Sequence, residues 1–334
     1  MEEVAVKPFT QDLLRRWLSP AVIIVLVLLA GFVPWLVNRE NVWNLLYLIC
    51  LYITLGQSWN ILAGFAGQTS LGHAAFFGIG ALVVRTLWLG GVPFFLAFPL
   101  AGVAAVAFSL IIGVPTFRLR GAYFAIATLG VAEVLRIIVS QNLPMISTIS
   151  AVQIANYNLP TRYYAMLGLT LATMVSAYLL LRSSLGLGIL AVREDEEAAR
   201  ATGVSVLGHK LLALVMSSFF AGLAGSMFAF QQISYYPSAP FNPNWSFESV
   251  LVAYVGGLGS LIGPVIGAIF YIFVHEVLAI RLVNFHQVIF GLLFIVIVLL
   301  FPGGLMEAWN RIAILLKQIW KKVVSHRKPG GQPL

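Results

Sequence analysis

The chain has 334 residues, 60% of them hydrophobic and only 10% charged, and its mean hydropathy is +0.93. A soluble domain would carry about a quarter charged residues, so the composition excludes a soluble protein with an ordinary polar surface. The net charge of +8 does not indicate nucleic-acid binding, because lysine and arginine gather on the cytoplasmic side of membrane proteins. We therefore predict an all-α integral membrane protein.

Long uncharged stretches predict about ten transmembrane or re-entrant helices, since one crossing takes about 20 apolar residues. No charged residue occurs between Glu40 and Arg85. In chain order, the expected helices are residues 20–37, 42–63, 69–88, 93–116, 121–141, 161–182, 208–231, 247–261, 263–280 and 284–301. The third and the eighth are short and rich in glycine, which favours broken or re-entrant helices. Cys50 stands alone in an apolar segment and is expected to be a core residue.

The distribution of lysine and arginine predicts an N-in, C-in topology, with both chain ends in the cytoplasm. The uncharged loops at 142–160 and 232–246 suit the outer face, whereas the loop at 183–207 is charged and suits the cytoplasm. We expect a cytoplasmic segment at 1–19 and a transmembrane domain at 20–301. Residues 302–334 are expected to form a basic amphipathic helix on the inner leaflet, followed by a cytoplasmic tail.

Two pairs of short segments show weak internal sequence similarity. AGFAG at 63–67 is similar to AGLAG at 221–225, and QTSLG at 68–72 is similar to GSLIG at 259–263. With five helices in each half, the halves would form an inverted 5+5 repeat, as in many transporters. Small residues are common in membrane helices, so coincidence explains the similarity equally well.

The loop at 183–207 contains a short, highly charged stretch, REDEEAARATG at 193–203. We predict one helix over 189–201, ended by Gly203 because glycine tolerates the left-handed conformation found after helices. Acidic residues early in this helix and Arg200 late in it agree with the helix dipole. A free helix of this length is marginal in water, so the loop needs a partner to hold it.

Neutral polar side chains gather late in the second expected helix and around the third. Such groups are costly at membrane depth and usually face the protein interior or water. The candidate pathway-lining residues are Gln57, Ser58, Asn60, Gln68, Thr69, Ser70 and His73. They suit the passage of a zwitterionic amino acid, but they equally suit a structural role in which they satisfy exposed backbone where helices break. Glu133 and Arg136 are one turn apart and are expected to form a structural ion pair.

No catalytic, metal-binding or nucleotide-binding motif is found in the sequence. The phosphate-binding pattern GxxxxGK[ST] is absent, so the chain is not expected to hydrolyse ATP itself. His275 and Glu276 are sequence neighbours and cannot share a helix face, so they do not suggest a metal site. We expect no enzyme activity, no metal and no cofactor bound by this chain.

The charged loop also carries a family resemblance. Glu197-Ala198-Ala199-x-x-x-Gly203 resembles the EAA loop of ABC-importer permeases, which docks on the ATPase subunit, although the usual hydrophobic-Pro ending is absent here. Further segments resemble LivM-type permeases, the membrane subunits of branched-chain amino-acid ABC importers. In the family's order they are GQTSLGHAAFFGIGA (67–81), FRLRGAYFAIATLG (117–130), residues 193–229, VGGLGSLIGPVIGA (255–268) and FPGGLM (301–306).

This resemblance implies a permease of a bacterial or archaeal plasma (inner) membrane. Its partners would be two ABC ATPase subunits, which bind ATP and Mg, a second homologous permease, and an extracytoplasmic amino-acid-binding protein. The loop at 183–207, which we term the coupling loop, would transmit motion from the ATPases. The candidate coupling residues are Arg193, Glu194, Asp195, Glu196, Glu197, Ala198, Ala199 and Gly203.

Two alternatives remain open at this point. Urea, short-amide and nucleoside permeases resemble the same family, so the cargo could differ from a branched-chain amino acid. An ion-coupled secondary transporter that carries a proton on His73, Glu133 or Glu276 would need no ATPase. That reading leaves the coupling loop without a purpose.

Overall fold

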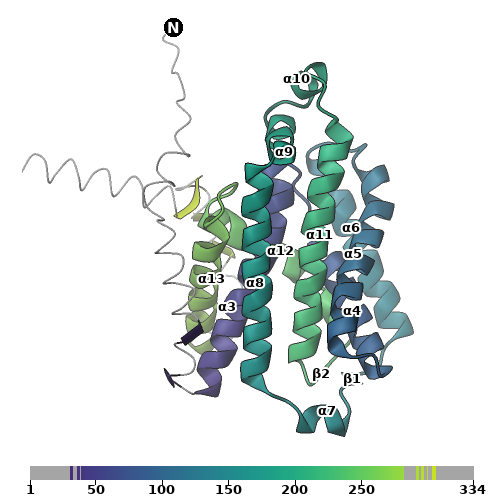
Figure 1. Cartoon of the computed structure of the whole chain (residues 1–334), viewed down its shortest axis with the longest axis vertical. Coiled ribbons are helices and arrows are strands. Elements are labelled where there is room, and N and C mark those ends of the chain that lie inside the picture. The colour runs from purple at the N-terminus through teal and green to yellow at the C-terminus, as the bar shows by residue number, and fades with distance from the viewer. Residues whose placement is uncertain are drawn as a thin grey trace, which may run out of the picture.

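The computed structural model describes residues 39–281 continuously, together with residues 31–32, 36–37, 291–292, 295–296, 299 and 303–305. Most of the expected helices at 20–37 and 284–301 and of the amphipathic helix at 302–334 lies outside the described residues. The described part is a bundle of helices with a short two-stranded sheet at one end (Figure 1).

Five helices in the described part are long and apolar enough to cross a membrane. They are α3 (Glu40–Asn60) with its extension η1 (Ile61–Phe65), α5 (Phe94–Thr116), α6 (Ala122–Asn142), α8 (Leu159–Arg182) and α11 (Val206–Gln231). Each lies within a few residues of an expected helix, so the prediction of an all-α membrane protein is confirmed.

Three shorter helices complete the bundle: α4 (His73–Leu89), α12 (Asn244–Gly256) and α13 (Gly263–Arg281). The third expected helix was placed four residues too early, because residues 69–72 form an irregular segment before α4. The eighth was placed too far along the chain. The chain leaves α12 at Gly257, whose φ of +126° is outside the helical range, and an irregular turn leads to α13.

Small residues allow α4 and α11 to pack closely. A Cβ atom on Gly80 would lie 1.9 Å from the carbonyl oxygen of Gly222, and one on Gly225 would lie 1.9 Å from that of Phe77. Close backbone approach at glycines is a common way to associate helices within a membrane. AGLAG at 221–225 is therefore regular helix at a packing interface, whereas most of AGFAG at 63–67 belongs to the π-helix η1.

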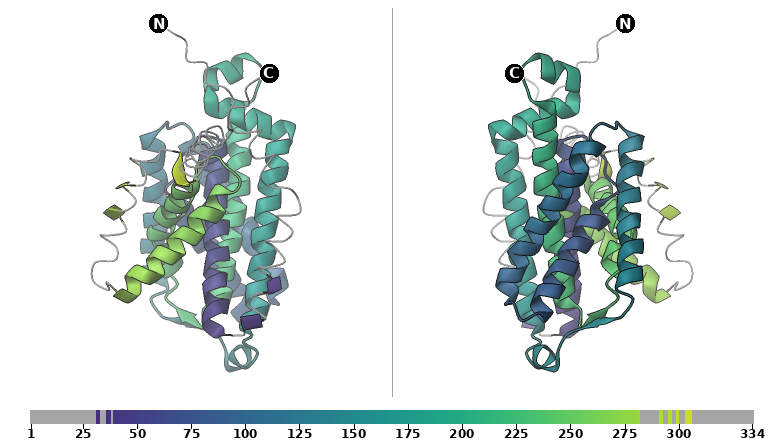
Figure 2. Two further views of the ribbon diagram at one scale, coloured as in Figure 1. Left: turned by 90° about the vertical axis from the view of Figure 1, so that its left-hand side faces the viewer. Right: turned by 90° about the vertical axis from the view of Figure 1, so that its right-hand side faces the viewer.

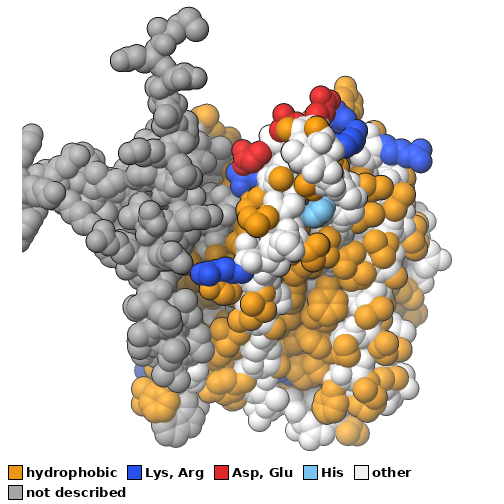
Figure 3. Space-filling view, turned by 45° about the horizontal axis from the view of Figure 1, so that its top comes forward, with side chains coloured by type: hydrophobic (Ala, Val, Ile, Leu, Met, Phe, Trp, Pro, Cys, Tyr) orange, Lys and Arg blue, Asp and Glu red, His pale blue; other side chains and the backbone are white. Residues whose placement is uncertain are grey.

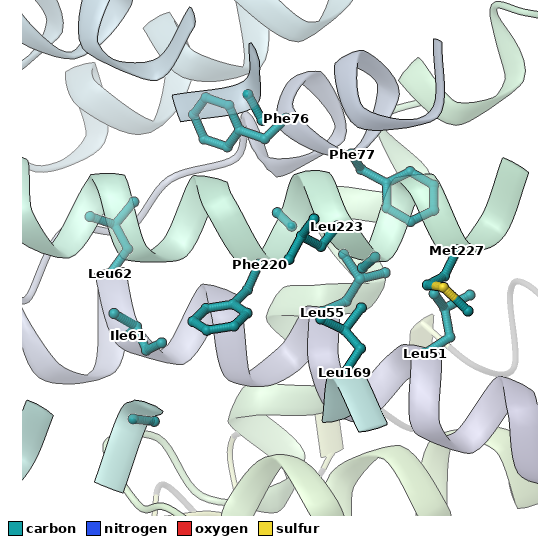
Figure 4. Close-up of a cluster of buried hydrophobic side chains, with 14 of the residues drawn as sticks. Leu51, Leu55, Ile61, Leu62, Phe76, Phe77, Leu169, Phe220, Leu223 and Met227 are labelled. Carbon is teal, nitrogen blue, oxygen red and sulfur yellow. The ribbon is translucent and has the colours of Figure 1, made fainter. Parts of the chain in front are cut away.

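The hydrophobic core fills the space between α3, α4, α8 and α11 (Figure 4). In Figure 4, Leu55 of α3 lies toward Phe220 and Leu223 of α11, Leu51 lies beside Met227, and all five are buried. Cys50 belongs to this same core, as expected. The core fixes α3 beside α11, which brings the end of α3 close to the coupling loop.

The two expected outer loops meet at one end of the bundle. Strand β1 (Ser147–Thr148) pairs antiparallel with β2 (Ser234–Tyr235), in the register Ser147↔Tyr235. The short helices α7 (Ala151–Ala155) and η2 (Ala239–Phe241) flank the pair. The coupling loop forms α9 (Ser184–Glu194) and α10 (Glu196–Ala201), which lie beyond the opposite end of the bundle in all views (Figures 1 and 2).

Candidate functional site

The coupling loop bends at Asp195, a junction that we term the elbow. The prediction of one continuous helix over 189–201 is wrong, because Asp195 is extended (φ −157°, ψ 116°) and separates α9 from α10. Its carboxylate accepts hydrogen bonds from the backbone N–H groups of Glu197 (2.8 Å) and Ala198 (3.0 Å). These bonds cap α10. They also hold the pKa of the Asp195 carboxyl below its usual value, and the bond from Ala198 lowers it most.

Gly203 ends α10, as predicted. Its φ is +86°, and no atom would meet a Cβ placed on it, so the conformation rather than space favours glycine. The N–H of Gly203 donates to the carbonyl of Arg200 (3.1 Å), and the N–H of Val204 donates to that of Ala199 (2.9 Å). This pair of bonds is a Schellman motif, which satisfies the last carbonyls of the helix. Both ends of α10 are thus fixed by local hydrogen bonds.

Two of the candidate coupling residues hold α10 against this chain's own bundle. Glu196 forms an ion pair with Lys210 of α11, whose side chain is only 4% exposed. Ala199 is buried in a small apolar cluster with Val192 and Val206. One side of α10 is therefore held against the end of α11.

The remaining coupling candidates divide between exposed side chains and an inward contact. Arg193 donates from Nη1 to the carbonyl oxygen of Gly64 in η1, at 2.8 Å. The guanidinium also pairs with Glu194 at 3.8 Å, and the Arg193 side chain is 38% exposed. The other exposed members are Glu194, Asp195, Glu197, Ala198 and Gly203. Figure 3 shows acidic and basic side chains gathered over this end of the bundle, whereas the flank below is mostly hydrophobic. The exposed set therefore forms a compact polar surface at the end of an apolar body.

A cavity of about 480 Å³ lies beside the elbow. It joins three segments that are far apart in the sequence: residues 67–69, the turn between α5 and α6, and residues 192–197. Its lining residues are Gly67, Gln68, Thr69, Arg120, Gly121, Phe124, Val192, Arg193, Glu194, Asp195, Glu196 and Glu197. The structure thus brings two candidate pathway residues, Gln68 and Thr69, next to the coupling loop.

Most of the other pathway candidates are engaged with this chain. Asn60 accepts from the N–H of Gly259 and donates to the carbonyl of Ser260, both at 2.8 Å. The carbonyl of Ser70 accepts from the Trp59 indole at 2.7 Å. These contacts fit the structural role, in which polar groups satisfy backbone where helices break.

Three of the seven pathway candidates lie deeper in the bundle. His73 places Nε2 2.7 Å from Ser217 Oγ on α11, and Ser58 donates to the carbonyl of Leu55 within its own helix. Gln57 differs from these. Its side chain is fully buried, and neither amide atom has a hydrogen-bond partner within the described residues. Gln57 is therefore the pathway candidate whose polarity the described contacts leave unexplained.

Comparison with known proteins assigns the chain to a family. A family model described as "Branched-chain amino acid transport system / permease component" matches residues 41–298. The chain belongs to this permease family. It is 29% identical over 317 residues to the high-affinity branched-chain amino acid transport system permease protein LivM of Escherichia coli strain K12, covering 85% of this chain and 74% of that protein. The LivM protein of Salmonella typhimurium strain LT2 gives the same figures.

A more distant relative is archaeal. The chain is 23% identical over 231 residues to the probable branched-chain amino acid transport permease protein LivM of Methanocaldococcus jannaschii, covering 63% of this chain and 67% of that protein. No solved structure matches. The resemblance to LivM-type permeases is confirmed, and these relatives are transport permease components rather than enzymes. Together with the apolar helices, the family makes this chain a multi-pass membrane protein.

Two features of the permease were missed at the level of sequence. The π-helix η1 carries no distinctive signal beyond its glycine and alanine content. Glu248 on α12 was not among the candidate residues, and it accepts a hydrogen bond from the Tyr52 hydroxyl at 2.9 Å. Trp245 and Tyr271 surround the Tyr52 ring. A lone acid between two apolar segments was the available signal.

The ion-pair prediction holds. Arg136 donates to both carboxylate oxygens of Glu133, one turn away on α6. Their side chains are 40% and 37% exposed, so the pair lies on the surface of the described bundle rather than at a buried site. Among the described residues, no group of three or more His, Cys, Asp or Glu side chains could hold a metal ion.

Proposed function

We propose that this chain is the membrane-spanning permease subunit of an ATP-driven importer that translocates branched-chain amino acids. The helix α10 after the elbow is the main support for this proposal, because it is exposed on one side and held against α11 on the other. A protein that receives mechanical work from a separate ATPase needs such a contact. ATP and Mg would bind to two ATPase subunits, which dock on the coupling loop.

The proposed orientation places α9 and α10 in the cytoplasm and the β1–β2 pair on the outer face. Its support is the charge at the elbow and the absence of charge in the loops at 142–160 and 232–246. The complete fold would have about ten helices with both ends inside, and a 5+5 inverted repeat stays part of the proposal. Residues 1–19 and 302–334 would be the cytoplasmic segment and the membrane-surface helix.

Transport would proceed by alternating access with a second homologous permease. ATP binding draws the ATPases together and moves the elbow, and the membrane halves open in turn to the loaded binding protein and to the cytoplasm. Neutral polar groups such as Gln57, Gln68 and Thr69 are suited to a zwitterion, since a single fixed charge would hold one end of it too tightly. The branched-chain cargo rests on the names of the relatives. Urea, short amides and nucleosides remain the alternatives within this class.

The test is ATP-dependent uptake into vesicles that contain the permease pair, with ATPase subunits bound and binding protein outside. We expect leucine, isoleucine or valine to be taken up and to stimulate ATP hydrolysis. Glu197→Arg and Gly203→Trp should both abolish stimulation while the chain still reaches the membrane, the first because it reverses a charge on the exposed side of α10 and the second because it disturbs the left-handed turn that ends α10. Arg118→Glu reverses a charge on the exposed turn after α5 and serves as the matched control.

Three results would contradict the proposal. Uptake that persists without ATP and follows a proton gradient would indicate the secondary transporter instead. Uptake of urea or a nucleoside in place of leucine would keep the class and change the cargo. Equal activity of Glu197→Arg, Gly203→Trp and the parent would remove the coupling role from the elbow.

A further inference from the structure

The broken helix formed by α3 and η1 ends without a cation of its own. No basic residue occupies the last turn of either element. The last carbonyl groups of a helix lack donors within the helix, and the negative end of its dipole favours a positive charge there. Arg193 supplies that charge from 129 positions along the chain, by donating from Nη1 to the Gly64 carbonyl at 2.8 Å. A residue of the coupling loop thus acts as the cap of a membrane helix.

The same guanidinium lies where three segments meet. A Cβ on Gly259, in the turn after α12, would lie 2.9 Å from Arg193 Nη1, and a Cβ on Gly67 would lie 3.3 Å from its Cγ. Asn60 joins the turn to α3 through its two hydrogen bonds to Gly259 and Ser260. The end of α3, the α12–α13 turn and the coupling loop therefore share one small contact, and glycine at two of its positions leaves room for the arginine.

The coupling loop has a second attachment at a different place. On the far side of the elbow, Glu196 pairs with Lys210 of α11, while Arg193 on the near side reaches η1. Asp195, between them, is extended and caps α10 rather than continuing α9. A change in the angle of the elbow therefore shifts Arg193 relative to Gly64 while α10 stays on α11, because the two attachments lie on opposite sides of the bend.

We propose that Arg193 is a positioning residue that passes motion of the elbow to the irregular segment after η1, by holding or releasing the C-terminal end of the broken helix. This inference rests on the proposed function, because the elbow moves only if an ATPase docks on it. When the guanidinium leaves the Gly64 carbonyl, residues 66–72 and the α12–α13 turn lose a contact that they share, while the two hydrogen bonds of Asn60 still join the turn to α3. Those segments lead directly into α4 and α13, the two shorter helices that follow a break.

The experiment compares Arg193→Ala, Arg193→Gln and Arg193→Lys with the control Arg118→Ala, which removes an exposed arginine from the same end of the bundle. A reporter cysteine at Thr69, an exposed position in the irregular segment, is placed in a Cys50→Ala background. The first readout is the rate of maleimide labelling in the permease complex, with and without ATP and vanadate. The second, measured in chains that keep Thr69 and Cys50, is amino-acid uptake per ATP hydrolysed. The third is the amount of ATPase that copurifies.

We expect Arg193→Ala to label faster than the parent without nucleotide, by at most about tenfold, the ratio for one hydrogen bond from a charged group, because the Arg193 side chain is 38% exposed. Uptake per ATP should fall by a similar factor, while ATP hydrolysis and copurification of the ATPase persist. Arg193→Lys and Arg193→Gln should give intermediate values, because each keeps a donor, and they carry the test if the alanine variant fails to reach the membrane. Arg118→Ala should match the parent.

Failure of this inference and failure of the proposed function give different results. If the parent complex transports with ATP and Arg193→Ala matches Arg118→Ala in labelling and in coupling, the inference is overturned and the proposed function stands. If the alanine variant loses its ATPase on purification, Arg193 is a docking residue and the positioning role is wrong. If the parent shows no ATP-driven uptake, the proposed function fails, whatever the labelling rates are.

Discussion

The two ends of the described bundle differ in what their charged side chains contact. At the elbow, Glu197 and Arg200 are exposed, and the exposed Glu194 pairs with the guanidinium of its neighbour Arg193 at 3.8 Å. At the β1–β2 end, Arg85 and Arg162 are each only 2% exposed, and neither forms an ion pair within the described residues. Arg39 and Glu40 at the start of α3 are exposed at the β1–β2 end as well, so what distinguishes that end is its pair of buried arginines.

The buried arginines donate hydrogen bonds, mostly to backbone carbonyl groups of their own chain. Arg85 donates five hydrogen bonds, to the carbonyls of Ala229, Gln232 and Ile233 and to both oxygens of Ser147. Arg162 donates to the Gln231 carbonyl at 3.2 Å and lies 3.5 Å from the centre of the Tyr157 ring. These bonds fix the end of α11 and the paired loops. We infer that the elbow is suited to move when a partner contacts it, whereas the hydrogen-bonded opposite end keeps one conformation.

The largest expected effect is at Arg85. Arg85→Ala removes the donors of several buried carbonyl groups, and each unpaired group costs about 1–3 kcal/mol. We expect a loss of about 4 kcal/mol in the free energy of unfolding, because only part of this cost can be relieved by water entering from that end. Unfolding in mixed micelles with increasing denaturant measures it. Arg85→Lys keeps the charge but makes fewer hydrogen bonds, so its free energy of unfolding should lie between those of the parent and Arg85→Ala. A loss no larger than that of an exposed arginine such as Arg118 would show that the β1–β2 end is not held by this side chain.

The second prediction concerns the attachment of α10 to α11. Lys210→Met leaves the Glu196 carboxylate without its partner, and we expect a loss of about 2 kcal/mol, reduced from that of a fully buried pair because Glu196 is 27% exposed. The double variant with Glu196→Gln should recover part of the loss, since it removes the unpaired charge as well. A thermodynamic cycle of the single and double variants measures the coupling. Additive effects would mean that the pair does not hold the elbow.

The sequence anticipated the elements of the coupling end better than their connections. Gly203 was identified as a helix stop because its signal is local, and the Glu133–Arg136 pair because its spacing is local. The break at Asp195 was missed, since the surrounding residues favour helix and only the cap geometry shows that the aspartate begins a new one. Contacts such as Arg193 with Gly64 depend on how α3 and α9 pack, which no short pattern contains.

The third prediction uses Gln57, whose buried amide has no partner in the described part of the chain. Gln57→Leu replaces an unsatisfied polar group with an apolar one of similar size, so we expect stability to rise by about 1 kcal/mol. If Gln57 lines the pathway, the same change should raise the KM for uptake while ATPase coupling stays normal. Thermal unfolding and uptake kinetics give both values. A stabilised variant with unchanged uptake would remove Gln57 from the pathway candidates.

The smallest expected effect is the pH dependence of the elbow cap. The pKa of the Asp195 carboxyl is lowered in the folded chain by the N–H groups of Ala198 and Glu197. Its contribution is therefore present above the ordinary carboxyl pKa and is lost as the pH falls through the lower folded value. Hydrogen exchange at the amides of Glu197 and Ala198 should speed up, relative to the rest of α10, only in that acidic range. Asp195→Asn keeps a capping oxygen without a titrating group, so its exchange should not show this acidic transition, and Asp195→Ala should exchange fast at every pH. If Asp195→Asn shows the same acidic transition as the parent, the titrating group lies elsewhere, and the elbow is held by its other contacts, the Glu196–Lys210 pair and the buried Ala199, rather than by its cap.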